Sequence, residues 1–395
     1  MINWLQLTDE ERRISIEQAS VKSGITAKAI EKDWWVTLAL RALFQTTYSK
    51  YFIFKGGTSL SKGWGLIERL SEDADIALDP AIFGKVYKKN PSHSYVKALK
   101  REGCAFTSIS LKIAFEQALT AMDIPPGIVF VQAAPIPENI PDRDPQTLFM
   151  QYPSLYPQHK YIADEVKIEF GVRTLKEPSG IISIRSILSE VFPNKAYEEI
   201  PFEVAAVKPR NTFLEKAFLL HERLLSPGKE KIEGDRQSRH FYDLFRIMDT
   251  EEGLAALNDP ALYTTLLEHR KNYIRQSGVN YETLRYETIS FIPSIEWLPD
   301  FERDYKMMQQ EMIYGDSPDF DVMMNSLKLL NGRFRVAGQG RTLEDILERA
   351  KEELVDDSSN IVRIDLNYTD EEPVSYTLEF HRWKKELIFE SIQIN

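Results

Sequence analysis

The sequence contains a single cysteine, Cys104, in 395 residues. One cysteine excludes an internal disulfide framework and any zinc site built from several cysteines. No run of about 20 apolar residues occurs, which argues against a membrane-spanning helix. The first residues, MINWLQLTDEERR, lack the basic-then-apolar pattern of a secretion signal, so we expect a cytoplasmic protein.

The chain also lacks an excess of positive charge, because 49 Lys and Arg stand against 60 Asp and Glu and give a formal net charge of −11. Such a chain does not coat nucleic acid non-specifically, since that binding depends on clustered Lys and Arg. Residues 85–101 are a local exception. They carry six basic side chains and no acidic one: Lys85, Lys88, Lys89, Lys97, Lys100 and Arg101. This segment either guides a polyanionic acceptor or forms an ordinary solvated helical surface.

The most informative stretch runs from Tyr51 to Asp79. Residues 52–54 (FIF) predict a short buried strand, and Gly56-Gly57 ends it, because glycine permits a sharp turn and close approach to a ligand. Thr58-Ser59 is expected to cap the helix that follows. The amides at the start of this helix, the two hydroxyls and Lys62 together would cradle a phosphate group.

The next predicted strand opens with Asp73-Ala74-Asp75. Because residues two apart in a strand lie on the same face, Asp73 and Asp75 project together. Neighbouring carboxylates repel each other unless a positive charge lies between them, and Mg²⁺ completed by substrate phosphates is the usual partner. The stretch therefore predicts a site for a metal ion and a triphosphate.

The order of paired glycines, Thr/Ser, helix and Asp-x-Asp resembles the nucleotidyltransferase fold shared with DNA polymerase beta. The longer string FKGGTSLSK…IERLSEDADIAL resembles the AbiEii/AbiGii toxin family of bacterial nucleotidyltransferases. EKDWWVTLALRALF, residues 31–44, resembles the N-terminal part of longer family members. The resemblance implies a nucleotidyltransferase core with a mixed sheet at 51–208. Helical patterns at 1–50 and in a lobe at 209–335, along which the resemblance fades, complete the α+β protein that we expect. The resemblance also implies two Mg²⁺ ions and an NTP substrate.

Residues 161–173 (YIADEVKIEFGVR) alternate as a strand that puts its apolar residues on one face and Lys167 and Glu169 on the other. The resembled fold takes a third metal-binding carboxylate from such a strand. We therefore expect Glu169 to bind metal together with Asp73 and Asp75. The alternative is a carboxylate that only pairs with Lys167, and Glu165 is the second candidate ligand.

Residues 210–225 predict an amphipathic helix with Lys216 near its middle. Glu215, Lys216, Leu220 and His221 match a family motif of the form E-K-x-x-x-L-H. This match implies that Lys216 contacts the nucleotide phosphates or the leaving pyrophosphate, which suits an ammonium on a flexible stem. Composition alone would make Lys216 a surface lysine.

A second family motif follows a predicted flexible loop at 226–235 (SPGKEKIEGD). Arg236, Arg239, His240 and Asp243 have the spacing of one helix side and match R-x-x-R-D-x-x-D, with His240 in place of an aspartate. The match implies nucleotide contacts for both arginines, and a role for Asp243 in orienting Lys216 or completing the catalytic site. A helix-stabilising ion-pair network is the alternative. His221 and His240 lack the spacing of a zinc helix, so we expect packed, hydrogen-bonded histidines.

Residues 336–395 predict a small α+β appendage. It comprises a helix at 343–354 and three strands, of which the first two are joined as a hairpin across 369–373 (TDEEP). The appendage either binds a partner or covers the helical lobe.

Together these features predict a Mg²⁺-dependent nucleotidyltransferase that moves a nucleoside monophosphate from an NTP to an acceptor hydroxyl. The family resemblance implies an RNA acceptor, with tRNA ends as the leading expectation. It also implies the toxin half of an abortive-infection toxin–antitoxin pair, with a cognate antitoxin as partner. A small-molecule or protein acceptor is an open alternative, as is a non-catalytic nucleotide-binding or interaction protein on the same fold.

Overall fold

The computed structural model describes residues 2–125, 127–159, 162–224, 236–337, 339, 341–353, 359–368, 374–383 and 386–395. The chain forms two compact units, Met1–Lys208 with Gln310–Asp316, and Pro209–Gln309 with Ser317–Asn395. The domain boundaries proposed from the sequence, after residues 50, 208 and 335, stay predictions. The predicted loop at 226–235 and the predicted hairpin connection at 369–373 lie outside the described residues.

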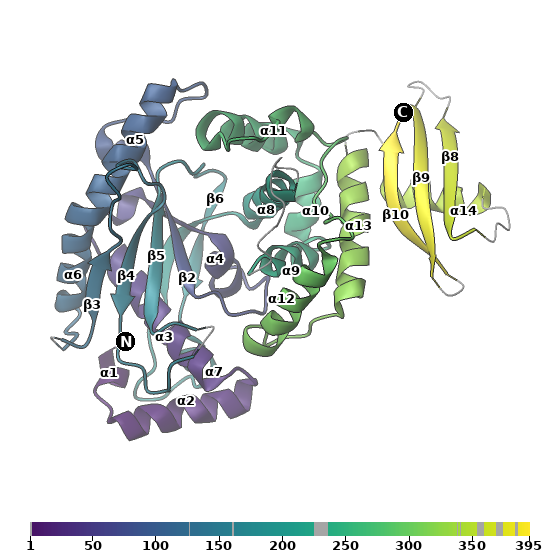
Figure 1. Cartoon of the computed structure of the whole chain (residues 1–395). Coiled ribbons are helices and arrows are strands. Elements are labelled where there is room, and N and C mark those ends of the chain that lie inside the picture. Colours follow the sequence, from purple (N-terminus) through teal and green to yellow (C-terminus); the bar gives the residue numbers. More distant parts are fainter. Residues whose placement is uncertain are drawn as a thin grey trace. The chain divides into compact units, whose positions relative to one another are not determined.

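The first unit is built on a seven-stranded sheet in the order β3-β4-β5-β2-β1-β7-β6 (Figure 1). Its strands are β1 (Phe52–Lys55), β2 (Asp73–Leu78), β3 (Phe130–Ala133), β4 (Gln146–Gln151), β5 (Glu165–Gly171), β6 (Ser179–Ile184) and β7 (Phe202–Val207). β2 pairs in parallel with β5 and antiparallel with β1. The predicted mixed sheet is therefore confirmed, and β2 lies at its centre.

Seven α-helices surround this sheet in the part of the unit that the structure describes. They are α1 (Ile2–Leu5), α2 (Asp9–Ser23), α3 (Ala27–Phe44), α4 (Gly56–Lys62), α5 (His93–Phe106), α6 (Lys112–Ala121) and α7 (Ile187–Val191), with short helical turns η1 (Ser49–Tyr51), η2 (Pro80–Phe83) and η3 (Thr107–Leu111). α2 begins at a capping box, because Thr8 accepts from the Glu11 amide and the Glu11 carboxylate accepts from the Thr8 amide.

Helix α3 packs on the apolar face of the sheet (Figure 1). Trp34 and Trp35 are fully buried, and the Trp35 ring stacks on Tyr152 with centroids 4.8 Å apart. On the strands, Phe52 and Phe170 lie on this same buried face, with centroids 6.3 Å apart. Because side chains alternate along a strand, the opposite face receives the polar residues of β1, β2 and β5.

A short segment from late in the chain, Gln310–Asp316, completes the first unit. The Leu70 amide donates to the Met312 carbonyl at 2.7 Å, and the Tyr314 amide donates to the Glu68 carbonyl at 3.0 Å. Arg69 and Ile313 form an isolated antiparallel bridge between these bonds. This segment thereby fixes the backbone that leads into β2.

The second unit combines helices with a three-stranded sheet of order β10-β9-β8. Its elements are α8 (Pro209–Leu224), α9 (Ser238–Ile247), α10 (Glu251–Leu257), α11 (Pro260–His269), η4 (Arg270–Ile274), η5 (Tyr281–Thr283), α12 (Leu298–Glu311), α13 (Phe320–Val336), α14 (Leu343–Glu353), β8 (Ile361–Tyr368), β9 (Val374–Trp383) and β10 (Glu386–Ile394). In the described part of the chain, no helix is long and apolar enough to cross a membrane.

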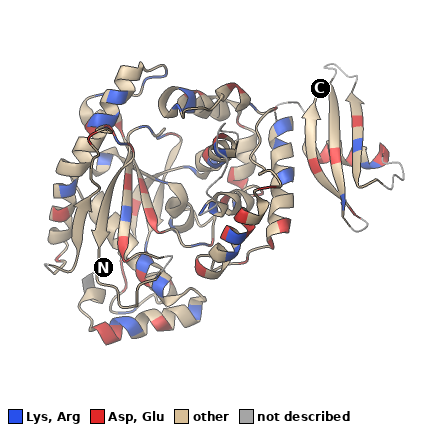
Figure 2. Cartoon of the chain, viewed as in Figure 1, with Lys and Arg blue, Asp and Glu red and all other residues tan. Residues whose placement is uncertain are grey.

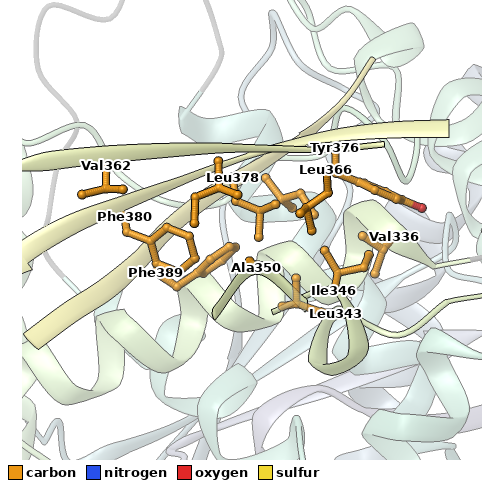
Figure 3. Packing of buried hydrophobic residues seen from close by; sticks show 12 residues of the cluster. Val336, Leu343, Ile346, Ala350, Val362, Leu366, Tyr376, Leu378, Phe380 and Phe389 are labelled. Carbon is orange, nitrogen blue, oxygen red and sulfur yellow. The ribbon is translucent and has the colours of Figure 1, made fainter. Parts of the chain in front are cut away.

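The predicted helix and three strands of the appendage are confirmed. Its buried side chains interdigitate between the sheet and α14, as Figure 3 shows for Leu343, Ile346, Leu378 and Phe389. Val336 joins the same cluster from the end of α13. The appendage therefore covers the end of the helical lobe, and binding of a further partner stays a prediction.

Candidate active site

Three carboxylates occupy neighbouring positions on the polar face of the central strands. In the parallel register of β2 and β5, Asp73 lies opposite Lys167 and Asp75 lies opposite Glu169. The charged segments of β2 and β5 are visible side by side in Figure 2. The predicted alternation of both strands is confirmed, and we call Asp73, Asp75 and Glu169 the acidic face.

Lys167 lies among these carboxylates. Its Nζ is 2.8 Å from Glu169 Oε1 and 3.9 Å from Asp73 Oδ2. Burial disfavours the charged ammonium, but the hydrogen bond to Glu169 and the charges of the acidic face outweigh it, so the pKa of Lys167 is raised. The second ligand candidate, Glu165, lies at the first position of β5.

The paired glycines pack directly against this part of the sheet. Gly56 has a positive φ of 77°, and a Cβ built on it would lie 2.1 Å from Asp75 Oδ2. A Cβ on Gly57 would lie 2.8 Å from Arg69 Nη2 and 2.9 Å from Ser71 Oγ. A larger residue at Gly56 would therefore be strained and would displace the Asp75 carboxylate, whereas one at Gly57 would require the ends of the Arg69 and Ser71 side chains to shift.

If Asp75 has the role predicted from the sequence, Gly56→Ala should lower nucleotidyl transfer roughly 100-fold, because the added Cβ displaces the Asp75 carboxylate. The matched control is Gly65→Ala, since Gly65 also has a positive φ, of 63°, but a Cβ added there would have no atom within 4 Å. Both variants carry the backbone strain, about 1–2 kcal/mol, and thermal unfolding measures it. Equal activities in the two variants would show that the close packing of Gly56 against Asp75 does not matter for transfer.

The prediction that Thr58 and Ser59 cap a helix is wrong. Helix α4 begins two residues earlier, at Gly56, with Lys55 at the N-cap position, because the positive φ of Gly56 lets the chain pass from strand to helix at once. Thr58 Oγ1 donates to Ser71 Oγ at 2.8 Å and Ser59 Oγ donates to the Gly56 carbonyl at 2.9 Å. Both residues are fully buried, and their contact with a triphosphate stays a prediction.

Lys62 forms a buried ion pair with Asp33. Its Nζ lies 2.5 Å from Asp33 Oδ1, and the two side chains are 7% and 5% exposed. Asp33 Oδ2 also accepts from the Ile187 amide at 2.7 Å. The predicted phosphate contact of Lys62 stays a prediction, and it requires this pair to rearrange.

Asp33 belongs to a run of three buried charged residues, Glu31-Lys32-Asp33, that sequence reasoning left without a role. Glu31 accepts from the Leu155 amide at 2.7 Å. Lys32 donates to the Ala163 carbonyl at 3.0 Å and lies 4.0 Å from Glu72, the residue before Asp73. Burial lowers the pKa of Lys32, and the nearby negative charge of Glu72, which acts to raise it, offsets only part of this effect. Each residue fastens a different segment to α3, and the signal for this was three consecutive charges within an apolar helix.

In the second unit, Lys216 and Asp243 form a buried ion pair. Lys216 Nζ lies 2.8 Å from Asp243 Oδ2, and the two side chains are 9% and 0% exposed. His240 Nδ1 lies 3.5 Å from the same ammonium. A surface lysine is therefore the wrong interpretation of Lys216. The geometry agrees with orientation of Lys216 by Asp243, while the catalytic roles of both stay predictions.

The prediction that Arg236 lies on the same helix side as Arg239, His240 and Asp243 is wrong, because α9 begins only at Ser238. Arg236 precedes the helix with a positive φ of 60°, and its amide donates to Asp304 Oδ1 at 2.7 Å. The Ser238 amide donates to Asp304 Oδ2 at 2.8 Å, so a distant aspartate on α12 fixes the start of α9. Nucleotide contacts of Arg236 and Arg239 stay predictions.

His221 is a packed histidine with hydrogen bonds to both ring nitrogens, as expected. The Ser290 amide donates to Nδ1 at 2.9 Å, and Thr283 Oγ1 lies 3.0 Å from Nε2. Burial lowers the pKa of His221 to about 4, because the site disfavours the charged ring. The ring is therefore neutral at pH 7.

This shift predicts acid sensitivity of the second unit. Between pH 6.5 and 4, the unfolded chain binds a proton at His221 that the folded protein does not. The contribution of neutral His221 to the free energy of unfolding is therefore complete above pH 6.5. As the pH falls below this value, the free energy of unfolding decreases by roughly 3 kcal/mol at most. Urea unfolding at pH 7.5 and 5 should show this loss, and His221→Gln should reduce it. The exposed His93 serves as control, since an equal effect of His93→Gln would contradict the assignment.

The acidic face fits Mg²⁺ by the chemistry of its donors, which are carboxylate oxygens at adjacent sheet positions. Among the residues that the structure describes, no group of three or more acidic, histidine or cysteine side chains is arranged to hold a metal ion. Mg²⁺ does not require such a cage, because it binds through one or two carboxylates together with water and substrate phosphates. The residues present therefore suit a metal that binds together with a nucleotide.

A mixed sheet with paired glycines packed against an Asp-x-Asp strand is the arrangement expected of a nucleotidyltransferase. The sequence model of one family, described as the nucleotidyl transferase AbiEii toxin of a type IV toxin–antitoxin system, matches residues 38–326. This match spans well over half of the chain, so the protein belongs to the AbiEii family of nucleotidyltransferase toxins. It is an enzyme of that class, which takes an NTP, and its family implies an antitoxin partner.

Among solved structures, the chain is similar to MenT4, a nucleotidyltransferase toxin from Mycobacterium tuberculosis H37Rv. The two are 17% identical, the alignment covers 88% of this chain and 96% of MenT4, and the TM-score is 0.49. No curated protein matches the chain. The assignment to a family therefore rests on the family match, which favours an enzyme over a non-catalytic nucleotide-binding protein.

Proposed function

We propose that this protein is a Mg²⁺-dependent nucleotidyltransferase that transfers a nucleoside monophosphate from an NTP to a hydroxyl of RNA, with tRNA as the acceptor. The observation that carries the proposal is the register of β2 and β5, which puts Asp75 opposite Glu169, while Asp73, two residues before Asp75, lies on the same face. Like charges are unfavourable in opposite positions of a sheet, so this arrangement calls for a cation.

In the proposed reaction, Asp73, Asp75 and Glu169 would hold two Mg²⁺ ions. Bound Mg²⁺ supplies charge stabilisation for the attacking and leaving oxygens. The turn at Gly56-Gly57, together with Thr58, Ser59 and Lys62, holds the nucleotide, and Arg236 and Arg239 contribute further contacts. Lys216, oriented by Asp243, binds the phosphates or the departing pyrophosphate. The acceptor hydroxyl attacks the α-phosphorus in line, so positioning and electrostatics account for most of the catalysis.

The RNA acceptor is supported by the basic segment at 85–101, although part of its charge is neutralised. Lys85 pairs with Glu102, and Lys100 pairs with Asp142. Lys97 and Arg101 lie on the exposed side of α5, where a polyanion can reach them. We further propose that the protein acts in the cytoplasm as the toxin of an abortive-infection system and that a cognate antitoxin counteracts it.

The proposal is tested by incubating the protein with each α-labelled NTP, Mg²⁺ and total bacterial RNA, and by resolving the labelled products. We expect label in tRNA-sized species. The double variant Lys97→Glu/Arg101→Glu should reduce labelling of RNA, whereas Arg13→Glu/Lys22→Glu, a matched reversal on the exposed side of α2, should not. Label in a protein or small molecule, unaffected by either reversal, would refute the RNA acceptor and keep the transferase.

A further inference from the structure

Lys167 lies where it can neutralise the acidic face when no nucleotide is bound. Lys167 is on β5, directly opposite Asp73 and two residues before Glu169. Its ammonium donates to Glu169 Oε1 and lies within ion-pair distance of Asp73 Oδ2. On the other side of β2, Lys55 is the register partner of Asp75. The acidic face is therefore bordered by lysines in the strands on both sides.

Of these two lysines, Lys167 reaches two of the three carboxylates, at 2.8 and 3.9 Å. Its side chain is 36% exposed, as against 26% for Glu169 and 23% for Asp73. A partly exposed lysine has a strongly hydrated ammonium on a flexible four-carbon stem, so it can leave its partners without breaking the core. A divalent cation and this ammonium would draw on the same carboxylate oxygens.

We propose that Lys167 is the resident counterion of the acidic face. It neutralises Asp73 and Glu169 in the metal-free protein and competes with free divalent cations for them. Metal alone therefore binds weakly, and the negative charge of a bound triphosphate tips the competition towards the metal. This inference rests on the proposed function, because it takes the acidic face as the metal site.

The direct test measures binding of Mn²⁺, without nucleotide, by electron paramagnetic resonance. We expect Lys167→Met to bind Mn²⁺ roughly tenfold more tightly than the wild type, because a competing charge within 4 Å of the ligands is removed. Lys167→Arg, which keeps the charge, should resemble the wild type. The control is Lys176→Met, since Lys176 pairs with Asp79 at 2.5 Å outside the acidic face.

Two further comparisons make the result decisive. Adding Asp75→Asn to Lys167→Met should abolish the gained affinity, which places the bound ion at the acidic face. In EDTA, Lys167→Met should melt several degrees below the wild type. Mn²⁺ should raise its melting temperature again and so remove this difference. If Lys167→Met binds Mn²⁺ no more tightly than Lys176→Met, or is unfolded with and without Mn²⁺, Lys167 is an ordinary structural residue and the proposal fails.

These outcomes are independent of catalysis. If the wild type transfers no nucleotide under any condition but Lys167→Met still gains Mn²⁺ affinity, the proposed reaction fails and the counterion role stands. If transfer is observed and the Mn²⁺ affinities of Lys167→Met and the wild type are equal, the reaction stands and the counterion role fails.

Discussion

Replacing Asp75 with asparagine is expected to reduce nucleotidyl transfer roughly 10³-fold and to leave the first unit folded. The asparagine keeps the shape of the side chain and removes its charge, so a loss of transfer would report on the electrostatic stabilisation that the proposed mechanism assigns to the carboxylate. Asp75 lies opposite Glu169 in the β2–β5 register, and like charges in such positions destabilise a sheet. The melting temperature should therefore be unchanged or slightly raised.

Asp73→Asn should behave in the same way, with one difference. It removes the carboxylate that lies 3.9 Å from the Lys167 ammonium, so we expect no gain in melting temperature. Labelled transfer to RNA and thermal unfolding are measured on the same preparations.

The matched control for both variants is Asp79→Asn, directly after the end of β2. Asp79 accepts from the Ala81 amide at 2.9 Å and pairs with Lys176. Asparagine keeps the acceptor for that amide and loses only the partly exposed ion pair, so the replacement should cost at most about 1 kcal/mol of stability and leave transfer intact. Full activity of Asp75→Asn, with an intact fold, would remove the acidic face from the mechanism. Equal losses of activity in Asp75→Asn and Asp79→Asn would indicate damage to β2 rather than to chemistry.

The parts of the candidate site that lie within single strands were predictable, because side chains alternate between the two faces of a strand. The alternation of β2 and β5 repeats every two residues, which placed Asp73 with Asp75 and Lys167 with Glu169 before the register was known. The turn at Gly56-Gly57 was predictable from residue type, because glycine permits a sharp turn. The start of α4 was not, because helix propensity is a weak guide where a strand continues directly into a helix through one positive φ.

The contacts that the sequence did not reveal join residues far apart in the chain. Arg236 and Asp304, which fix the start of α9, are 68 residues apart. Lys32 reaches the carbonyl of Ala163 over 131 residues, and nothing in a local pattern says which charges of an apolar helix will find such partners. Tertiary contacts also bring residues 310–316 back to the first unit, although the local sequence continues the helical pattern of the lobe.

The burial of Lys216 gives the second large prediction. Lys216→Met should lower the free energy of unfolding of the second unit by about 3–5 kcal/mol, because it takes the Lys216 ammonium away from the fully buried Asp243 carboxylate. Denaturant unfolding measures this loss. The matched control is Arg363→Met, since Arg363 pairs with Glu379 at the same 2.8 Å but is 69% exposed, and an exposed pair contributes at most about 1 kcal/mol.

Loss of transfer in Lys216→Met alone does not separate catalysis from stability, so the double variant Lys216→Met/Asp243→Leu is decisive. An apolar pair of similar volume should recover most of the lost stability, because both charges of the buried pair are then removed together. If Lys216 binds the nucleotide phosphates, the double variant stays inactive in spite of its recovered fold, and its inactivity cannot be attributed to unfolding. Recovery of transfer together with stability would show that the pair only holds α8 against α9. The same two measurements therefore decide between a catalytic lysine and the buried ion pair seen at 2.8 Å.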